Sequence, residues 1–373
     1  MSILRLVKID NYIRLKDISD ISIGEFVRKD KQNDNYEYPV YNGGTTNTGY
    51  YFEYNNEGNK IIISARGAAG FVNRVFTKYW AGNSCYSIKI TSKSFDWNFV
   101  YYYLKQQQKS LINLQQTGSI PSVSKKQVEE IGIPNVDIKV QEEIVKILDS
   151  FTNLIDTLNE ELSLRQKQFE YYREKLLTFD DTSLLKSIKE IGTLYRGNGL
   201  QKKDFVEEGV GCIHYGQIYT KLGFSLSKPL TYVTKETAKP LTKVRKGDLV
   251  IACTSENIED VCKSVVWEGE EEIVTGGHAC VLRHNENPRY IGYFFQTHQF
   301  FMQKKQYAYG AKVIDIKTEK LGEILIPIPP LAIQQSIVEK LDAFESLIAS
   351  LKEEIALRQK QYEYYREKLL TFD

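Results

Sequence analysis

The sequence predicts an α/β protein: two α/β domains at opposite ends of a pair of long antiparallel coiled-coil helices, in a pseudo-two-fold (cyclic) arrangement. Three observations support this prediction. The stretch RQKQFEYYREKLLTFD at residues 165–180 returns at residues 358–373 with one change, Phe169 to Tyr362. Both copies continue a heptad spacing of apolar residues, and the regions that precede them share little sequence. The offset of 193 residues indicates a duplicated domain rather than a short structural repeat.

Each repeated segment is predicted to form one long helix. Apolar residues recur in alternating steps of four and three over residues 144–179 and again over residues 337–372, and neither run contains Gly or Pro. This spacing over about four heptads is typical of a coiled coil. Arg165 and Arg358 interrupt the two seams at equivalent places, where they either fix the register or extend to solvent. Antiparallel pairing is the simplest arrangement, because the first helix enters the second variable region and the second helix leaves it.

The repeat divides the chain into four predicted parts. Residues 1–140 form the first variable domain, residues 141–180 the first long helix, residues 181–333 the second variable domain, and residues 334–373 the second long helix. The overall net charge is +1, but the two variable domains carry +5 and +2, whereas the two helical segments carry −4 and −2. Mildly basic domains permit contact with DNA without requiring it.

Both variable domains follow one plan of short strands and an aromatic helix. Apolar runs bounded by polar loops predict strands at residues 60–64, 71–75 and 87–90, and at residues 247–252 and 279–282. Aromatic-rich segments predict a helix at residues 97–108 and another at residues 290–301. The sequence therefore predicts two domains of similar architecture whose loops differ.

Composition favours a cytoplasmic protein with reduced thiols. The chain is 42% hydrophobic, which is typical of a soluble globular protein. No apolar run reaches the roughly 18 residues of a membrane span, and the first residues lack a signal-peptide pattern. The five cysteines are scattered without close pairing, as in proteins of a reducing compartment.

The sequence contains none of the common catalytic motifs. It has no G-x-x-x-x-G-K-[ST], no G-x-S-x-G and no H-E-x-x-H pattern, and its four histidines lack zinc spacing with cysteine. We therefore expect no catalytic residues and no metal ligands. A recognition or assembly protein is the better prediction for a chain of this size.

Taken together, these features resemble the specificity (S) subunit of type I restriction-modification systems. The resemblance covers the whole chain and rests on the two unlike domains, the near-identical helices, and Ile-Pro entries that are followed by glutamine. The entries read 133-IPNVDIKVQEEIVKILD-149 and 326-IPIPPLAIQQSIVEKLD-342. The second entry fits the family pattern better, because Pro329-Pro330 are replaced by Val136-Asp137 in the first.

The resemblance implies a role and a set of partners. Each variable domain would be a target recognition domain that reads one half of a split, asymmetric DNA target. The helices would fix the spacer and dock two methyltransferase (M) subunits, and restriction (R) subunits would complete the complex. S-adenosylmethionine, ATP and Mg²⁺ would bind those partners, which carry adenine methyltransferase and ATP-dependent endonuclease activity. The chain itself would be non-catalytic and without a cofactor.

Candidate DNA-binding residues are polar or cationic side chains in loops of the two domains. Such side chains bond base edges or phosphates, although each one alone is also typical of an ordinary solvated surface. The candidates are Asn42, Thr45, Thr46, Arg66 and Arg74 in the first domain, and Lys202, Lys203, His278, Lys304, Lys305 and Lys312 in the second.

Candidate partner-binding residues come from the near-identical helices. The two copies agree at positions outside the heptad seam, which seam packing does not require. One partner that docks twice would explain this agreement, and so would a recent duplication. Aromatic and arginine side chains dominate interface energies, so Tyr171, Arg173, Tyr364 and Arg366 are the candidates. The alternative function is a coiled-coil adaptor that binds two protein ligands.

Overall fold

The structure is a computed structural model that describes residues 11–113 and 121–372. The chain divides into two compact units that do not follow chain order. Unit 1 combines residues up to 160 with residues 352–373, and unit 2 comprises residues 161–351. Each unit therefore holds one globular α/β domain, part of the long helix that follows this domain, and part of the other long helix. The predicted combination of two α/β domains with a pair of long helices is confirmed.

Unit 1 contains these globular elements: β1 (Tyr12–Arg14), α1 (Leu15–Ile18), β2 (Ser19–Ile23), β3 (Tyr38–Tyr41), β4 (Tyr50–Tyr51), β5 (Lys60–Ser64), β6 (Val72–Val75), β7 (Trp80–Ala81), β8 (Cys85–Ile90), α2 (Trp97–Gln106), α3 (Gln108–Asn113), α4 (Lys125–Glu129) and β9 (Gly132–Pro134). Unit 2 contains β10 (Leu185–Ser187), α6 (Ile188–Ile191), β11 (Gly192–Arg196), β12 (Phe205–Val206), β13 (Val210–Ile213), α7 (Tyr215–Thr220), β14 (Ser225–Leu226), β15 (Thr231–Val233), α8 (Lys235–Ala238), β16 (Thr242–Val244), β17 (Leu249–Ala252), β18 (Thr254–Ser255), β19 (Ser264–Trp267), β20 (Ile273–Thr275), β21 (Ala279–His284), α9 (Pro288–Phe294), α10 (His298–Tyr307), β22 (Ile314–Asp315), α11 (Thr318–Leu321) and β23 (Leu325–Pro327).

One sheet topology underlies both domains. The central sheet has the order β2-β8-β5-β6 in unit 1 and β11-β21-β17-β19-β14 in unit 2. The backbone hydrogen bonds beyond the paired strands also correspond: Ala65 N donates to Ser84 O, and Cys253 N donates to His278 O, both at 2.8 Å. The apolar runs predicted as strands at 60–64 and 247–252 form the buried centre of these sheets as β5 and β17.

The two domains differ in their second sheet and in one helix. Unit 1 adds a three-stranded sheet, β4-β3-β7, whereas unit 2 adds five strands in the order β12-β15-β13-β20-β16. The single helix predicted at 290–301 is wrong, because the chain there forms two helices, α9 and α10. The hydroxyl of Thr297 accepts a hydrogen bond from Phe300 N (3.2 Å) and so caps the second helix.

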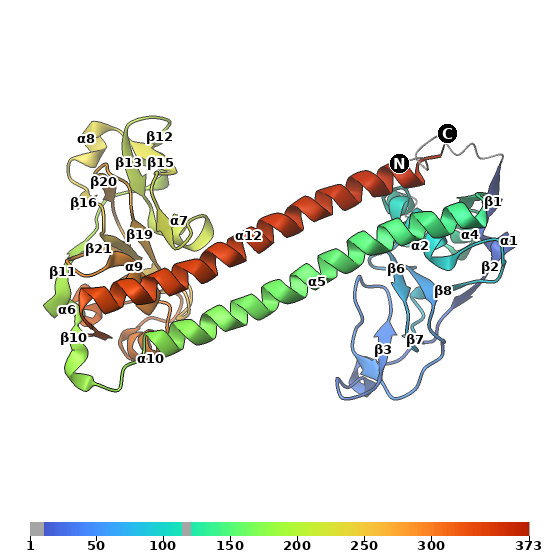
Figure 1. Cartoon of the computed structure of the whole chain (residues 1–373), viewed down its shortest axis with the longest axis horizontal. Helices are drawn as coiled ribbons and strands as arrows, with labels where there is room; N and C mark the ends of the chain where they lie inside the picture. Colours follow the sequence, from blue (N-terminus) through green and yellow to red (C-terminus); the bar gives the residue numbers. More distant parts are fainter. Residues whose placement is uncertain (1–10, 114–120, 373) are drawn as a thin grey trace. The chain divides into compact units, whose positions relative to one another are not determined.

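The long helices are α5 (Ile138–Leu176) and α12 (Leu331–Leu370). Within unit 1 the start of α5 and the end of α12 share one apolar cluster that includes Ile144 and Leu369, so the helices run in opposite directions there (Figure 1). Phe151 stacks on Tyr365 with ring centroids 5.3 Å apart. The equivalent pair in unit 2, Phe344 and Tyr172, stacks at 5.4 Å. The predicted antiparallel pairing is therefore confirmed within each unit.

The seam arginines bond to their own helices. Arg165 Nη1 donates to Gln168 Oε1 (3.0 Å), and Arg358 donates to Glu354 (2.7 Å) and Gln361 (2.9 Å). Of the two interpretations for these residues, extension away from the seam fits these contacts better than fixing of the register.

A buried glutamine connects each long helix to its globular domain. Gln141, which is fully buried, accepts from Asp96 N (2.9 Å) and donates to the carbonyls of Ser94 and Val136. Asp96 caps α2, so the glutamine joins the starts of two helices. Gln334, 193 residues later, makes the equivalent contacts with Asn287 N (3.0 Å), Pro329 O and Glu286, and Asn287 caps α9.

A carboxylate about two helical turns later makes the second connection. In unit 1 Asp149 accepts from Tyr102 Oη (2.6 Å) and Arg74 Nη2 (3.0 Å). In unit 2 the equivalent Asp342 accepts from Tyr293 Oη (2.5 Å) and Arg289 Nε (2.9 Å). Burial, together with the bond to the carboxylate, raises the pKa of both tyrosines.

We predict that Gln141→Leu lowers the free energy of unfolding of unit 1 by about 3 kcal/mol, because it leaves one buried backbone N–H and two carbonyls without partners. Denaturant titration followed by circular dichroism measures this change. Gln359→Leu, the same substitution at an exposed position of α12 within unit 1, should cost less than about 0.5 kcal/mol. Equal losses in the two variants would contradict the structural role of Gln141.

Candidate nucleic-acid interface

In unit 1, three loops meet where strand β5 ends and the antiparallel strand β8 begins. Ser64 Oγ donates to Gly44 O (2.8 Å), Ala68 N donates to Gly43 O (2.8 Å), and Ser84 N donates to Asn42 Oδ1 (3.0 Å). A side chain at Gly43 would lie 2.3 Å from Arg66 O, so this close approach of the loops requires glycine. We call this region, residues 42–48, 65–70 and 82–84 with Ser122, sheet-end surface 1.

Sheet-end surface 1 brings together four of the five residues predicted for this domain. Thr45, Thr46 and Arg66 are exposed, and no carboxylate within the described residues forms an ion pair with Arg66. Asn42 is half-buried, and its side-chain oxygen accepts a hydrogen bond from Ser84 N. The side-chain NH₂ group is the part of Asn42 that could bond to DNA. An unpaired guanidinium beside two hydroxyls suits contact with phosphate or with guanine.

In unit 2, the same end of the sheet carries a connected set of side chains. Thr254 Oγ1 lies 3.1 Å from His278 Nδ1 and donates to Asp315 Oδ2 (2.9 Å). Arg196 Nη2 also reaches Asp315 Oδ2 (3.4 Å), and Tyr309 Oη donates to its other oxygen (3.2 Å). These residues belong to sheet-end surface 2, which comprises residues 196–203, 253–255, 276–278 and 309–315.

A hollow of about 370 Å³ opens beside His278 on sheet-end surface 2. Its lining includes Lys202, His214, Tyr215 and His278, together with Gly199 and Gly277. Lys202 lies in a 3₁₀ helix, η3 (Lys202–Asp204), and is exposed, as are Lys203 and Lys312. Burial, helped by the nearby Lys202 and His278, lowers the pKa of His214 and so favours its neutral form.

Positions of the two surfaces correspond through the backbone. Arg66 pairs with Ser122 in an antiparallel β-bridge, and Thr254 pairs with Asp315 in the same way between β18 and β22. The following residues also match, because Val123 N donates to Ala65 O (2.9 Å) and Ile316 N donates to Cys253 O (3.1 Å). One frame therefore presents Arg66, Ser84 and Ser122 in unit 1, and Thr254, His278 and Asp315 in unit 2.

Two predicted DNA-binding residues have structural roles instead. Arg74 holds Asp149, and its guanidinium carbon also lies 4.7 Å from the ring centroid of Tyr101. Lys304 is 4% exposed, and its ammonium group donates to the carbonyls of Glu259 (2.9 Å) and Val261 (2.6 Å). We remove both from the candidate interface. Lys305 is exposed on α10, and no hydrogen bond among the described residues connects it to sheet-end surface 2.

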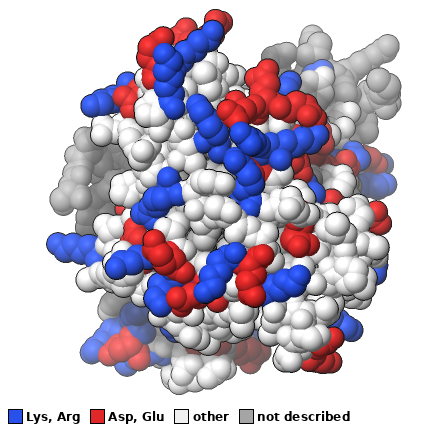
Figure 2. All heavy atoms as spheres, turned by 90° about the vertical axis from the view of Figure 1, so that its left-hand side faces the viewer, with Lys and Arg blue, Asp and Glu red and all other residues white. Residues whose placement is uncertain are grey.

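Charge does not mark an interface on the face of unit 2 that Figure 2 shows, because Lys and Arg are interspersed there with Asp and Glu. Several cations of this unit are paired, for example Arg245 with Glu272 (3.0 Å) and Arg289 with Glu268 (2.7 Å). Contact with phosphates would therefore depend on the unpaired lysines of the loops rather than on a broad basic face.

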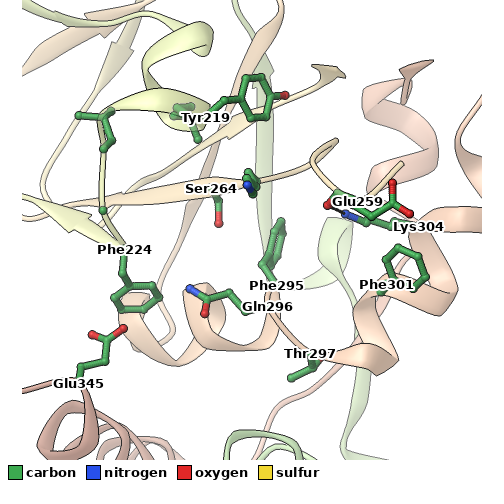
Figure 3. A pocket seen from close by; sticks show the side chains of 14 residues that line it. Tyr219, Phe224, Glu259, Ser264, Phe295, Gln296, Thr297, Phe301, Lys304 and Glu345 are labelled. Carbon is green, nitrogen blue, oxygen red and sulfur yellow. Dashed lines mark hydrogen bonds between the residues drawn. The ribbon is translucent and has the colours of Figure 1, made fainter. Parts of the chain in front are cut away.

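A larger cavity of about 570 Å³ lies elsewhere in unit 2, between residues of α7, α10 and α12. Figure 3 shows Glu345 beside Phe224 on one side of it, and Lys304 beside Glu259 on the other. Burial raises the pKa of Glu345, whose carboxylate also contacts Arg289 (3.5 Å). These contacts make the polar lining part of the packing between the domain and α12.

The candidate partner-binding residues separate into two kinds. Tyr171 and Tyr364 are 58% and 52% exposed, and Lys175 and Lys368 lie over their rings at 5.6 and 4.6 Å. Arg173 and Arg366 instead bond the globular domain of their own unit, through Gln296 (3.1 Å) and Gln106 (2.8 Å). The arginines are therefore removed from the predicted docking surface, and the tyrosines remain.

Sequence reasoning missed Thr254, Asp315 and Ser84. The match between 61-IIISARG-67 and 249-LVIACTS-255, in which a buried strand ends at a polar residue, would have indicated Thr254. Ser84 and Asp315 lie outside these stretches and join the surfaces through backbone pairing. Two absences apply to residues 11–113 and 121–372 only: no group of three or more His, Cys, Asp or Glu is placed to hold a metal ion, and no helix is long and apolar enough to cross a membrane.

We predict that Arg74→Met lowers the free energy of unfolding of unit 1 by about 2 kcal/mol, since Asp149 loses its cation while one third of it stays in solvent. Lys93→Met, at an exposed lysine of the same domain, serves as the control and should have little effect. Denaturant titration distinguishes the two. An unchanged stability together with weaker binding to DNA would return Arg74 to the interface.

Comparison with known proteins identifies the family. A family model described as the type I restriction modification DNA specificity domain matches residues 11–164 and again residues 183–357. A Haemophilus influenzae protein named as a type I restriction enzyme specificity subunit is 29% identical over 350 residues, which cover 88% of this chain and 87% of that protein. The specificity subunit of an Escherichia coli type I restriction enzyme is 32% identical over 249 residues, 64% of this chain and 61% of its own. The crystal structure of an S subunit from M. genitalium has the same fold, with a TM-score of 0.64 and 17% identity over 98% of both chains. The chain therefore belongs to the family of type I restriction-modification specificity subunits.

Proposed function

We propose that the chain is the sequence-specific DNA-binding subunit of a type I restriction-modification complex. Residues 1–140 and 181–333 would be its target recognition domains, and each would read one half of a split target. The observation that carries this proposal is the shared backbone frame of the two sheet-end surfaces with unlike side chains at equivalent positions. Arg66 in one unit corresponds to Thr254 in the other, and Ser84 to His278. Two unlike readers on one frame are what an asymmetric target requires.

The proposed DNA contacts are the accessible members of both surfaces. Arg66 with Thr45 and Thr46 would contact the first half-site, where the guanidinium group suits guanine or a phosphate. Lys202, Lys203 and Lys312 would contact phosphates around the second half-site. Lysine contacts of this kind position the protein and make binding depend on salt, but they carry no sequence information.

The long helices would fix the spacer between half-sites and dock two M subunits. Both helices are continuous over 39 and 40 residues without Gly or Pro, so they suit a rigid spacer. Tyr171 and Tyr364 are exposed, lie outside the seam and stand in sequences that differ only at Phe169 and Tyr362, which supports docking of one kind of partner twice. In this proposal the chain is non-catalytic. The M subunits would hold S-adenosylmethionine, and R subunits would bring ATP and Mg²⁺.

Methylome sequencing of cells that express the chain with its M subunit tests the function. We predict a bipartite motif with unlike halves and a fixed gap. Replacing residues 1–140 by the corresponding domain of another family member should change one half only. A change in both halves, or a continuous motif, would contradict modular reading. Complete absence of a new motif with a well-formed complex would argue for the adaptor function.

We predict that Tyr171→Ala together with Tyr364→Ala weakens binding of the M subunit by at least about tenfold, because buried aromatic anchors dominate interface energies. The mass of the complex measures the outcome: wild type should hold two M subunits per chain, and either single variant should hold one at limiting concentration. Leu154→Ala, at another exposed apolar residue of α5, is the matched control. Full affinity in the double variant would assign the sequence identity of the helices to duplication alone.

A further inference from the structure

The inference concerns His278 and rests on the proposed function. Its backbone has a φ of 68°, in the left-handed region that non-glycine residues seldom adopt. Its side chain is exposed just before the start of β21 and contacts Thr254, which is itself hydrogen-bonded to Asp315. Strained residues of this kind gather at functional sites, where the surroundings hold one conformation in place.

The hydrogen-bond donors and acceptors next to His278 determine which nitrogen of its ring carries the proton. An ionised carboxylate only accepts, so the single hydroxyl hydrogen of Thr254 must point to Asp315 Oδ2, at 2.9 Å. Thr254 Oγ1 is then left to accept, and its neighbour His278 Nδ1, at 3.1 Å, must donate. In the neutral ring the proton therefore lies on Nδ1, and Nε2 is a bare acceptor.

Two further donors show that the carboxylate of Asp315 acts as a hydrogen-bond acceptor. Arg196 Nη2 (3.4 Å) and Tyr309 Oη (3.2 Å) both donate to it. The remaining charged or titratable groups near the ring come from η3, β13 and α7: Lys202 and His214 line the same hollow, and the ring of Tyr215 lies 5.0 Å from that of His278.

We propose that His278 is a specificity-determining residue of the second half-site, which offers Nε2 as an acceptor to the exocyclic amino group of a base. In the major groove only adenine N6 and cytosine N4 present such a donor. Guanine O6 and N7 and thymine O4 are acceptors and would face the lone pair of Nε2. The Asp315–Thr254–His278 chain thus selects between two classes of base through one fixed tautomer.

His278→Asn is the diagnostic variant. Asparagine tolerates the left-handed backbone, and its amide nitrogen can donate to Thr254 as Nδ1 does, but it has no atom in place of Nε2. The native complex of chain and M subunits is bound to duplexes that carry the motif found by methylome sequencing. Each adenine of the second half-site is replaced in turn by purine, and each cytosine by pyrimidin-2-one, which removes only the amino group.

At about pH 8, where a histidine side chain is ordinarily neutral, one replacement should weaken binding of the wild type about tenfold more than binding of His278→Asn. The base at that position shows whether adenine or cytosine is read. Thr254→Val removes the hydroxyl that accepts from Nδ1, so the proton is no longer held on that nitrogen. This variant should lose most of the tenfold difference in binding although it keeps the imidazole. Nitrogen-15 spectra of labelled histidine should place the proton of His278 on Nδ1, with His278→Asn identifying the signal.

Equal penalties in wild type and His278→Asn at every adenine and cytosine would overturn the inference while sequence-specific binding persists. A proton found on Nε2 would overturn it as well. A complex that binds no motif would instead overturn the proposed function, and with it this assignment.

Discussion

Each globular domain depends on one carboxylate of its long helix. Asp149 and Asp342 occupy equivalent positions, and each receives a buried tyrosine hydroxyl and an arginine. The arginines reach it from different elements, Arg74 from β6 and Arg289 from α9. The aspartate of each long helix therefore has the same kinds of partner, although the arginine comes from a different element in each domain. A domain of new sequence fits the helix if it supplies one tyrosine and one cation at this point, together with a helix whose N-cap residue donates its backbone N–H to Gln141 or Gln334.

Periodic features of the sequence were sufficient to predict the long helices, the duplication and the central strands. The heptad spacing and the buried runs at 60–64 and 247–252 are local signals, and local signals survive in a single sequence. The connections between helix and domain are not local. Asp149 and Arg74 are far apart in the chain, and nothing in the spacing of either indicates the other. The offset of 193 residues does mark Gln141 and Gln334 as a matched pair, but most of their partners are backbone atoms, which no residue pattern identifies.

Several candidates are exposed, as a DNA contact would need, where one polar turn carries them, and a candidate is inaccessible where packing buries it. Thr45 and Thr46 are exposed because their loop is polar and rich in glycine. Lys304 has the same side-chain chemistry as Lys305, yet one turns into the domain to satisfy two carbonyls and the other remains in solvent. Only the helix packing distinguishes them. Residue type therefore predicts the kind of contact a side chain can make, and tertiary structure determines whether it is free to make it.

The frame of the sheet-end surfaces is held by backbone hydrogen bonds, which do not depend on side-chain identity. Ala65 N to Ser84 O and Cys253 N to His278 O are the same bond with different residues. Exposed side chains on such a frame contribute little to stability, since the strands beneath them already supply the buried apolar contacts. An arginine, Arg66, can then stand in one unit where the other has Thr254, and Ser84 can stand where the other has His278, with no change in the sheet. Stability resides in the strands and in the contacts of each domain with its long helix, so the side chains at the sheet ends are free to differ. If they contact DNA as proposed, this difference is what an asymmetric target would require.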